Sequence, residues 1–340
     1  MDEIQIVMYV GFLLAAYSVI GNDVIQTLGT FLSSNEKRHW TVLWLFAGSI
    51  LTIVLVYGWF VNNGDVSYGR LIGDEGLSNP KYKAPADIKS FGWPFLLPPI
   101  ILLIITRFGI PVSTSFLILT FFNPKNLDSM LVKSISGYAL ALVVAFIFYI
   151  ITARWLEKRF LDQRISDRNR ILWTIGQWLS TGFLWGQWLV QDFANIYVYL
   201  PRQISWQTLV VTVFVFLALL AYIFYSKGGA IQSIVRSKTN TTDIRSATLI
   251  DLCYGLILLY FKELSNVPMS TTWVFIGILA GRELAIRWRL NKTVSKSAFK
   301  DLGYDLLKVS FGLVVSIALV FIINNVAGTI LRLGGQIQLS

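Results

Sequence analysis

Four apolar runs of membrane-spanning length constrain this chain more than any other feature of its sequence. The runs are Ile4–Leu32, Leu43–Val61, Met130–Ile151 and Leu306–Val326. Each approaches or exceeds the roughly 20 residues that a helix needs to cross a bilayer. Only 14% of the 340 residues are charged, whereas a soluble domain carries about 25% charged residues. The chain is therefore predicted to be an all-α integral membrane protein, with the lipid bilayer as its surroundings.

The apolar pattern predicts ten membrane segments in two sets of five. The segments are 4–32, 41–62, 94–108, 111–123, 130–152, 172–200, 207–225, 246–264, 268–281 and 305–327. Because five is an odd number, the second set is reversed relative to the first, which predicts two inverted-topology repeats. Residues 1–152 form the first inverted repeat, residues 153–171 a basic cytoplasmic connector, and residues 172–340 the second inverted repeat. The third, fourth and ninth segments are short, so we expect discontinuous helices at the centre.

Two short polar patterns occur once in each predicted repeat, inside apolar sequence. An aspartate beside amides appears in Gly21-Asn22-Asp23-Val24-Ile25-Gln26 and again in Gln191-Asp192-Phe193-Ala194-Asn195. A proline followed by hydroxyls appears in Pro111-Val112-Ser113-Thr114-Ser115 and again in Pro268-Met269-Ser270-Thr271-Thr272. A carboxylate deep in hydrocarbon costs roughly 2.5–3.5 kcal/mol. Its duplication at matched places therefore predicts one site that both halves build.

The proline motifs are expected to bind an anion. Proline fits the first turn of a helix, so each motif is predicted to begin a half-helix inside the membrane. The free amides and positive dipole end of a half-helix attract anions, and hydroxyls donate hydrogen bonds to an oxyanion. The predicted substrate site consists of Ser113, Thr114, Ser115, Ser270, Thr271 and Thr272, together with the amides of Gln26 and Gln191. The alternative is that these hydroxyls bond to carbonyls of their own helices.

The aspartate motifs are expected to bind a cation. The carboxylates of Asp23 and Asp192 and the amide oxygens of Asn22 and Asn195 are hard ligands, which suit Na⁺ when unwound backbone carbonyls complete the shell. These four residues form the predicted cation site, with the two aspartates as Na⁺ ligands. One alternative is a carboxylate that binds and releases a proton. Another is a buried Asp–Asn pair that only holds helices together.

The sequence lacks the patterns of an enzyme or an ATP-driven pump. It contains no nucleophile–base arrangement, no Gly-rich phosphate loop and no metal-ligand spacing, and Cys253 and His39 are its only cysteine and histidine. We therefore expect no cofactor, apart from Na⁺ or H⁺ as a coupling ion. The formal charge of +10 does not predict a nucleic-acid partner, because basic residues gather in the loops of one side by about two to one. That side is predicted to be cytoplasmic, with both termini outside a plasma or inner cell membrane.

Through these four motifs the chain resembles the inorganic phosphate transporter (PiT) family of sodium- or proton-coupled phosphate symporters. That family carries Gly-Ala-Asn-Asp-Val-Ala-Asn in each inverted repeat, and Pro-Val-Ser-Thr-Thr-His later in each. The resemblance implies that phosphate lies between the two Pro-Ser-Thr half-helices and that the cation lies at the Asp and Asn positions. It also implies termini outside the membrane and a homodimer.

The chain departs from the family pattern at four positions. Phe116 and Trp273 replace the histidines, and Gln26 and Gln191 replace asparagines. These departures leave the substrate and the stoichiometry open. The leading prediction is cation-coupled symport of inorganic phosphate. The alternatives are a transporter of another oxyanion such as sulfate, or of another solute, and a membrane sensor or scaffold that does not transport.

Overall fold

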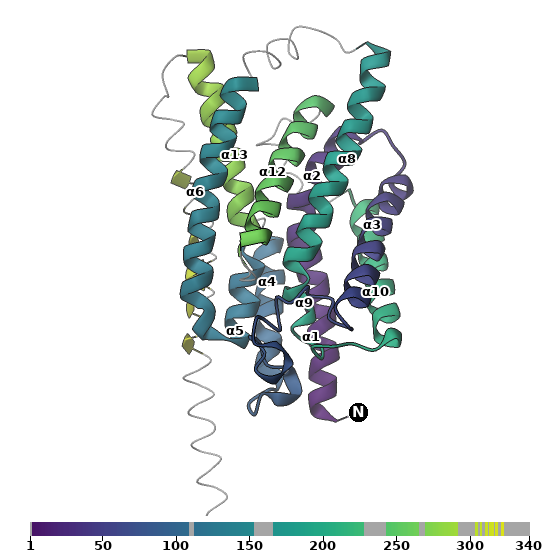
Figure 1. Cartoon of the computed structure of the whole chain (residues 1–340), viewed down its shortest axis with the longest axis vertical. Helices are drawn as coiled ribbons and strands as arrows, with labels where there is room; N and C mark the ends of the chain where they lie inside the picture. Colours follow the sequence, from purple (N-terminus) through teal and green to yellow (C-terminus); the bar gives the residue numbers. More distant parts are fainter. Residues whose placement is uncertain are drawn as a thin grey trace, which may run out of the picture.

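The computed structural model describes residues 2–108, 112–152, 166–227, 243–264 and 269–291, and then 303–304, 307, 310–311, 313–315, 317–318 and 321–322. Throughout this described part the regular elements are helices (Figure 1), which confirms the predicted all-α class. The longer helices are α1 (Glu3–Val19), α2 (Ile25–Ser34), α3 (Trp40–Val61), α4 (Leu97–Arg107), α6 (Leu127–Thr152), α8 (Asp167–Asp192), α10 (Trp206–Tyr225), α12 (Ile244–Leu264) and α13 (Thr271–Asn291). The shorter ones are the π-helical turns η1 (Ile20–Val24) and η5 (Ser115–Leu119), the short helices α5 (Thr120–Phe122) and α9 (Ala194–Tyr197), and the 3₁₀ turns η2 (Gly76–Ser78), η3 (Pro85–Asp87), η4 (Trp93–Leu96) and η6 (Pro124–Asn126).

Among the residues that the structure describes, five helical stretches are long and apolar enough to cross a membrane. They are Glu3–Val24, Trp40–Val61, Pro124–Ile151, Trp206–Tyr225 and Ile244–Glu263. A helix satisfies its own backbone hydrogen bonds, as the bilayer interior requires. Apolar side chains such as Ile53 and Phe214 face outward, exposed by 66% and 68%. This outward apolar surface is the one that a helical membrane protein presents to lipid.

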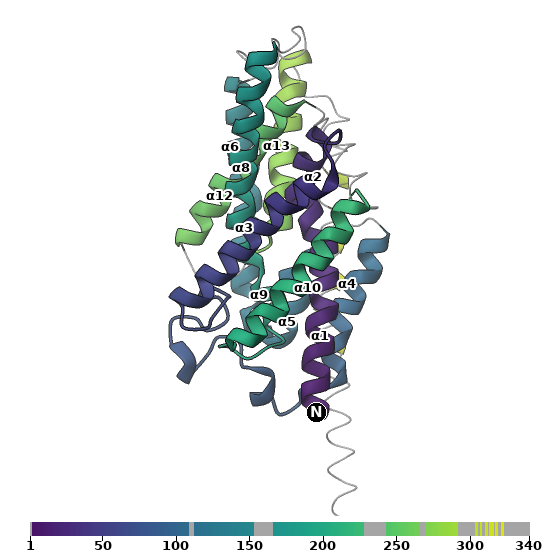
Figure 2. The ribbon, with the colours of Figure 1, turned by 90° about the vertical axis from the view of Figure 1, so that its right-hand side faces the viewer.

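The helices pack in pairs (Figures 1 and 2): α6 with α13, α8 with α12, α3 with α10, and α1 with α4. Two glycines bring α13 close to α6. A Cβ added at Gly277 would lie 2.6 Å from the carbonyl oxygen of Tyr138, and one added at Gly281 would clash with the carbonyl oxygen of Leu142. Small residues four positions apart allow this close backbone approach in membrane helices. Because α6 and α13 belong to different predicted repeats, the contact joins the two halves.

The structure corrects the predicted end of the ninth segment. That prediction ended the helix at residue 281, but α13 continues to Asn291. The charged residues beyond Gly281 are part of this helix, and Arg287 and Glu283 form an ion pair one turn apart within it. Likewise, α8 begins at Asp167, inside the predicted connector 153–171. Residues 153–165, Pro111, Pro268 and much of the tenth predicted segment lie outside the described residues.

All four polar motifs lie at departures from regular α-helix or at the start of a helix. Asp23 lies in the π-helical turn between α1 and α2, and Asp192 is the last residue of α8. Thr114 immediately precedes η5, and Thr271 begins α13. In Figure 1, η5 and α5 lead toward the end of the molecule that carries the N-terminus, whereas α13 runs away from it. These opposite directions are the ones that the predicted inverted repeats require.

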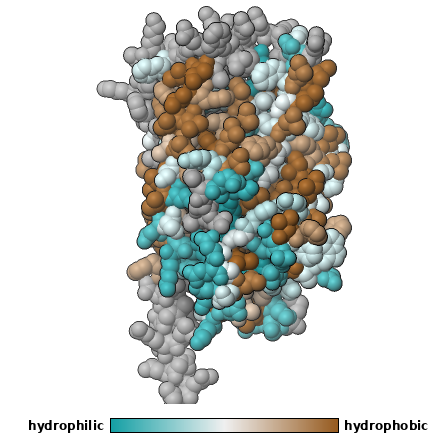
Figure 3. All heavy atoms as spheres, viewed as in Figure 1, coloured by the Kyte–Doolittle hydropathy of each residue, from teal (hydrophilic) through white to brown (hydrophobic). Residues whose placement is uncertain are grey.

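Residues 62–96 cover the end of the bundle that carries the N-terminus, which we call the N-terminal side (Figures 1 and 2). Hydrophilic residues gather over this end in Figure 3, and hydrophobic residues predominate over the opposite part. The loop has a fixed start, because Asp65 Oδ1 accepts a bond from the amide of Ser67 and its Oδ2 accepts one from the amide of Gly69, both 2.7 Å long. Gly69 has a φ of +77°, a conformation that glycine adopts at little cost.

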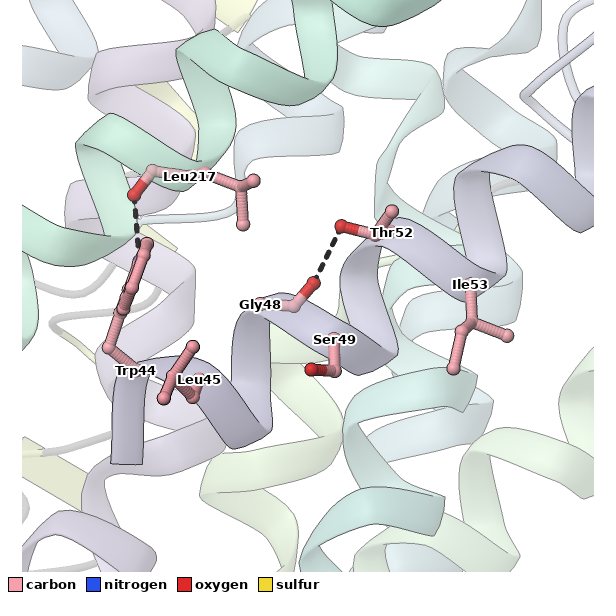
Figure 4. Close-up of a pocket in the computed structure, with 7 residues that line it drawn as sticks. All are labelled: Trp44, Leu45, Gly48, Ser49, Thr52, Ile53 and Leu217. Carbon is pink, nitrogen blue, oxygen red and sulfur yellow. Dashed lines mark hydrogen bonds between the residues drawn. The ribbon is translucent and has the colours of Figure 1, made fainter. Parts of the chain in front are cut away.

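A separate apolar groove of about 410 Å³ lies between α3 and α10 (Figure 4). The indole Nε1 of Trp44 donates to the carbonyl of Leu217 (2.9 Å) across this contact, and the Thr52 hydroxyl donates to the carbonyl of Gly48 (2.8 Å). Leu45 on its rim is 57% exposed. None of the predicted site residues lines this groove.

Candidate functional site

The first aspartate is held by an adjacent amide and by a distant hydroxyl. Asn22 Nδ2 donates to Asp23 Oδ1 (2.6 Å), and Thr114 Oγ1 donates to Asp23 Oδ2 (2.8 Å). Asn22 Nδ2 also donates to the carbonyl of Val112 (2.8 Å). The π-helical turn at Asp23 departs from regular α-helical geometry, as such turns often do at functional sites. The aspartate and hydroxyl motifs of the first half therefore form one cluster.

The second aspartate lies in a similar environment. Asn195 Nδ2 donates to Asp192 Oδ1 at a distance of 3.0 Å, and Ser115 Oγ donates to the same oxygen at 3.4 Å. The side chain of Thr271 also lies next to this carboxylate. Thr271 occupies the same place in the second hydroxyl motif as Thr114 in the first. Each aspartate is thus adjacent to the middle hydroxyl of the motif in its own half.

A continuous path of hydrogen bonds joins the two aspartates. Thr114 Oγ1, which donates to Asp23, also accepts a bond from Asn195 Nδ2 (3.0 Å). Asn195 in turn donates to Asp192. One hydroxyl and one amide therefore lie between the carboxylates, and none of these four side chains is more than 2% exposed. The structure brings the acidic and hydroxyl residues of both halves into one buried cluster.

The hydroxyl motifs contact each other through equivalent residues. Ser115 Oγ also lies 3.3 Å from the carbonyl of Met269, so its one O–H is shared between this carbonyl and Asp192, and Thr272 Oγ1 donates to the carbonyl of Val112 (3.2 Å). Ser115 and Thr272 occupy the same place after the proline, and so do Val112 and Met269. These donated bonds cross to the other motif and do not return to carbonyls of the same helix.

The first serine of each motif begins the helix that follows. Ser113 Oγ accepts a hydrogen bond from the amide of Phe116, and Ser270 Oγ accepts one from the amide of Trp273, both 3.3 Å long. A serine side chain that accepts a hydrogen bond from the amide three residues later is a common cap of a helix N-terminus. The amide of Ser270 also donates to Ser134 Oγ of α6 (2.9 Å), which ties the second motif to the first half.

The glutamines lie beside this cluster, and one of them has a free oxygen. Gln26 Nε2 donates to the carbonyl of Asn22 (3.2 Å), and Gln191 Nε2 donates to the carbonyl of Leu258 (3.1 Å). Within the described residues, Gln191 Oε1, Asp192 Oδ2 and Asn195 Oδ1 are buried without any hydrogen-bond partner. Leaving a buried acceptor unpaired costs about 1–3 kcal/mol. A hard cation takes such carboxylate and amide oxygens as ligands.

Aromatic rings occupy the places of the two family histidines. Phe116 and Trp273 meet edge to face, with ring centroids 6.4 Å apart and planes at 62°. Phe116 is fully buried, and Trp273 is 6% exposed. In the part of the chain that the structure describes, the indole Nε1 of Trp273 has no hydrogen-bond partner. The replacements remove two proton acceptors and add one unpaired donor.

Arg70 and Asp251 are among the buried charged groups that were not predicted from the sequence. Arg70 is 1% exposed, and its Nε donates to the carbonyl of Val190 (2.9 Å), which directly precedes Gln191. Arg70 lies in the polar stretch between the predicted segments 41–62 and 94–108, where no local signal indicates its burial. Asp251 of α12 accepts bonds from the hydroxyls of Thr30 and Thr181. A carboxylate within the apolar segment 246–264 was the signal that could have identified it.

The fold and the cluster define an α-helical membrane protein whose central polar site is built by both halves of the chain. No family model matches this chain, and no curated protein matches it. A solved structure described as "The sodium-dependent phosphate transporter" matches with a TM-score of 0.63 and 15% sequence identity, and the match covers 95% of this chain and 99% of that chain. The chain therefore has the fold of that transporter over nearly its whole length. At the level of the fold, this confirms the resemblance drawn from the four motifs.

Proposed function

We propose that this protein is a secondary transporter that couples the movement of inorganic phosphate to that of a cation, Na⁺ or H⁺. The observation that carries the proposal is the buried path from Asp23 through Thr114 and Asn195 to Asp192, because it joins both halves at one site. The solved structure with this fold is described as a sodium-dependent phosphate transporter. Hydroxyl donors for an oxyanion and free oxygens for a cation lie together in this chain.

The charges of the site explain why a cation would accompany the anion. When both are ionised, the buried carboxylates of Asp23 and Asp192 exceed by one negative charge the guanidinium of Arg70, which interacts with Asp192. In a medium of low dielectric constant, an anion that entered alone would be strongly repelled. A Na⁺ ion at the free oxygens of Gln191, Asp192 and Asn195, or a proton on one carboxylate, removes this repulsion. Cation and anion binding are then reciprocally favourable.

The interrupted helices supply the movement that transport needs. Discontinuous helices at the junction of two repeats allow one half to rock against the other around a fixed site. Asp23 and Asp192 lie at such interruptions, so their ligands would follow the movement of each half. In this proposal the N-terminal side faces outward across the cell membrane, and the homodimer follows from the family resemblance alone.

Uptake into proteoliposomes tests the proposal. We expect phosphate uptake to rise with an inward Na⁺ or proton gradient and to collapse in Asp23→Asn and in Asp192→Asn, because either change removes a charge that the cation neutralises. Asp251→Asn is the matched control, since Asp251 is equally buried but bonds to Thr30 and Thr181 outside the path. Its uptake should keep the same cation dependence. Uptake like that of the wild type in both site variants would refute the assignment.

Another oxyanion is the second candidate substrate, and one observation favours it. Phe116 and Trp273 remove two side chains that can accept a proton from a phosphate hydroxyl. Sulfate carries no proton at neutral pH and needs donors only. Competition between phosphate, sulfate, arsenate and organic anions for uptake would separate the two substrates. Anion binding without net flux would instead favour a sensor on this fold.

A further inference from the structure

The loop of residues 62–96 on the N-terminal side places the side chain of Arg70 next to the central cluster. Asp65 accepts the amides of Ser67 and Gly69, and the hydroxyl of Tyr68 donates to the carbonyl of Val54 in α3 (2.7 Å). These bonds fix the segment that immediately precedes Arg70. The side chain of Arg70 is then buried, with its Nε on the carbonyl of Val190 near the end of α8.

The guanidinium of Arg70 is incompletely satisfied. Its Nη1 is buried without a hydrogen-bond partner among the described residues, and so is Oδ2 of Asp192, two residues after the carbonyl that Arg70 contacts. Burial lowers the pKa of Arg70 to about 10, and the negative charge of Asp192 opposes this shift. The guanidinium is therefore charged at neutral pH. Two opposite charges lie within electrostatic reach, yet each keeps an unfilled hydrogen-bonding position.

A vestibule lined by charged residues lies close to this arginine, since Ile72 and Gly73 are among its lining residues. It has a volume of about 1070 Å³ and is lined by the loop, by residues near η6 and by the end of α12. Its charged lining residues are Lys81, Lys83, Lys89, Lys125, Lys262, Asp74, Glu75, Asp87 and Glu263. In Figure 1, α12 ends well short of the N-terminal side, and Lys262 and Glu263 at this end line the vestibule. The lysines exceed the carboxylates by only one, so the lining carries a slight positive excess.

Arg70 connects the vestibule with the aspartates, because Ile72 and Gly73, which follow it closely in the chain, line the vestibule, and its Nε donates to the carbonyl of Val190. Burial lowers the pKa of Lys81 in the vestibule wall, Asp74 opposes that shift, and the charge of Arg70 adds to it. Arg70 therefore interacts electrostatically with Lys81 on one side and with Asp192 on the other. The planar guanidinium fork presents donors whose geometry matches phosphate and other oxyanions.

We propose that Arg70 is a substrate-binding residue: its guanidinium donates directly to the bound oxyanion, which arrives through the vestibule, while a cation occupies the free oxygens beside Asp192. This inference rests on the proposed function, and it adds a ligand from the loop to the hydroxyls of the two motifs. The bound anion then accepts a hydrogen bond from the unpaired Nη1 of Arg70, and the bound cation contacts the unpaired Oδ2 of Asp192. Arg70 also makes the site favour anions over neutral solutes.

Calorimetric titration of the purified full-length protein with phosphate, at saturating Na⁺, tests this role. The variants are Arg70→Gln and Arg202→Gln. Arg202 is a matched control, because it is a buried arginine on the N-terminal side whose Nη2 donates to the carbonyls of Val198 and Leu200 (2.6 and 2.9 Å). Its neighbouring carboxylates are Asp65 and Asp87, not those of the site.

The two roles of Arg70 predict different results. If Arg70 binds the anion, Arg70→Gln should raise the Kd for phosphate at least about tenfold, as expected for a lost charged hydrogen bond. Its affinity for Na⁺ without phosphate should be unchanged or higher, and Arg202→Gln should bind phosphate like the wild type. An unchanged phosphate Kd in Arg70→Gln, with altered Na⁺ affinity, would mean that Arg70 only balances the charge of Asp192 and would overturn the inference.

Two further outcomes separate this inference from the proposed function. If the wild type itself does not bind phosphate in Na⁺, the proposed function fails and the inference fails with it. If Arg70→Gln does not fold, as judged by its melting without ligand, Arg70→Lys takes its place. Lysine keeps the charge but loses the planar fork, so phosphate should bind several-fold more weakly, and binding like that of the wild type would overturn the inference.

Discussion

Removal of one hydroxyl tests the hydrogen-bonded path between the aspartates. Thr114→Val keeps nearly the same shape but deletes Oγ1, which donates to Asp23 Oδ2 (2.8 Å) and accepts from Asn195 Nδ2 (3.0 Å). Asp23 Oδ2 then has no hydroxyl partner. Asn195 keeps its bond to Asp192. The perturbation therefore falls mainly on one buried carboxylate.

The expected loss of stability follows from these two bonds. A hydrogen bond to a charged group contributes about 1.5–3 kcal/mol and a neutral one about 0.5–1.5 kcal/mol. Thr114→Val should thus destabilise the Na⁺-free protein by about 2–4 kcal/mol, which lowers Tm by several degrees. Bound Na⁺ stabilises the folded protein, and at Asp23 it would replace the missing donor. The deficit in Tm should therefore be smaller in Na⁺ than in choline.

Melting of the purified protein in Na⁺ and in choline provides the assay. Thr212→Val is the control, since Thr212 is also buried but lies outside the site. Its hydroxyl forms hydrogen bonds of 2.8 Å with the Tyr197 hydroxyl and with the Leu209 carbonyl. Its deficit should be the same in both salts. Equal deficits of Thr114→Val in both salts would refute the prediction that Asp23, like Asp192, is a ligand of the cation. The absence of any deficit would refute the hydrogen-bonded path.

Two further variants test the family departures and the packing between halves. Phe116→His, beside Trp273, introduces an imidazole, whose ordinary pKa is near 6.5. Its positive form should repel the cation, so phosphate uptake should fall below about pH 6.5. A pH profile of uptake identical to that of the wild type would contradict this. Gly281→Ala forces a Cβ against the carbonyl of Leu142 and should destabilise by about 1–3 kcal/mol, whereas Gly186→Ala, which meets open space, should leave the melting temperature nearly unchanged.

Much of the fold could be predicted from the sequence because lipid imposes simple rules. Membrane helices must be apolar over about 20 residues, so the starts of α3 at Trp40 and α10 at Trp206 fall within one residue of the predicted ones. The end of α13 was missed because a helix can extend past the apolar region, with charges such as Glu283 and Arg287 paired along its surface. Hydropathy alone does not separate that case from a loop.

The sequence by itself determined that buried polar groups recur in both halves of an apolar chain, since a carboxylate such as Asp23 in hydrocarbon has a large energetic cost and needs a partner. Only the tertiary structure decided which partners these are. Thr114 and Asn195 join the aspartates, and the loop brings Arg70 to the same cluster, through contacts between residues far apart in the chain. Local sequence does not predict such contacts, because they depend on how whole helices and loops pack together.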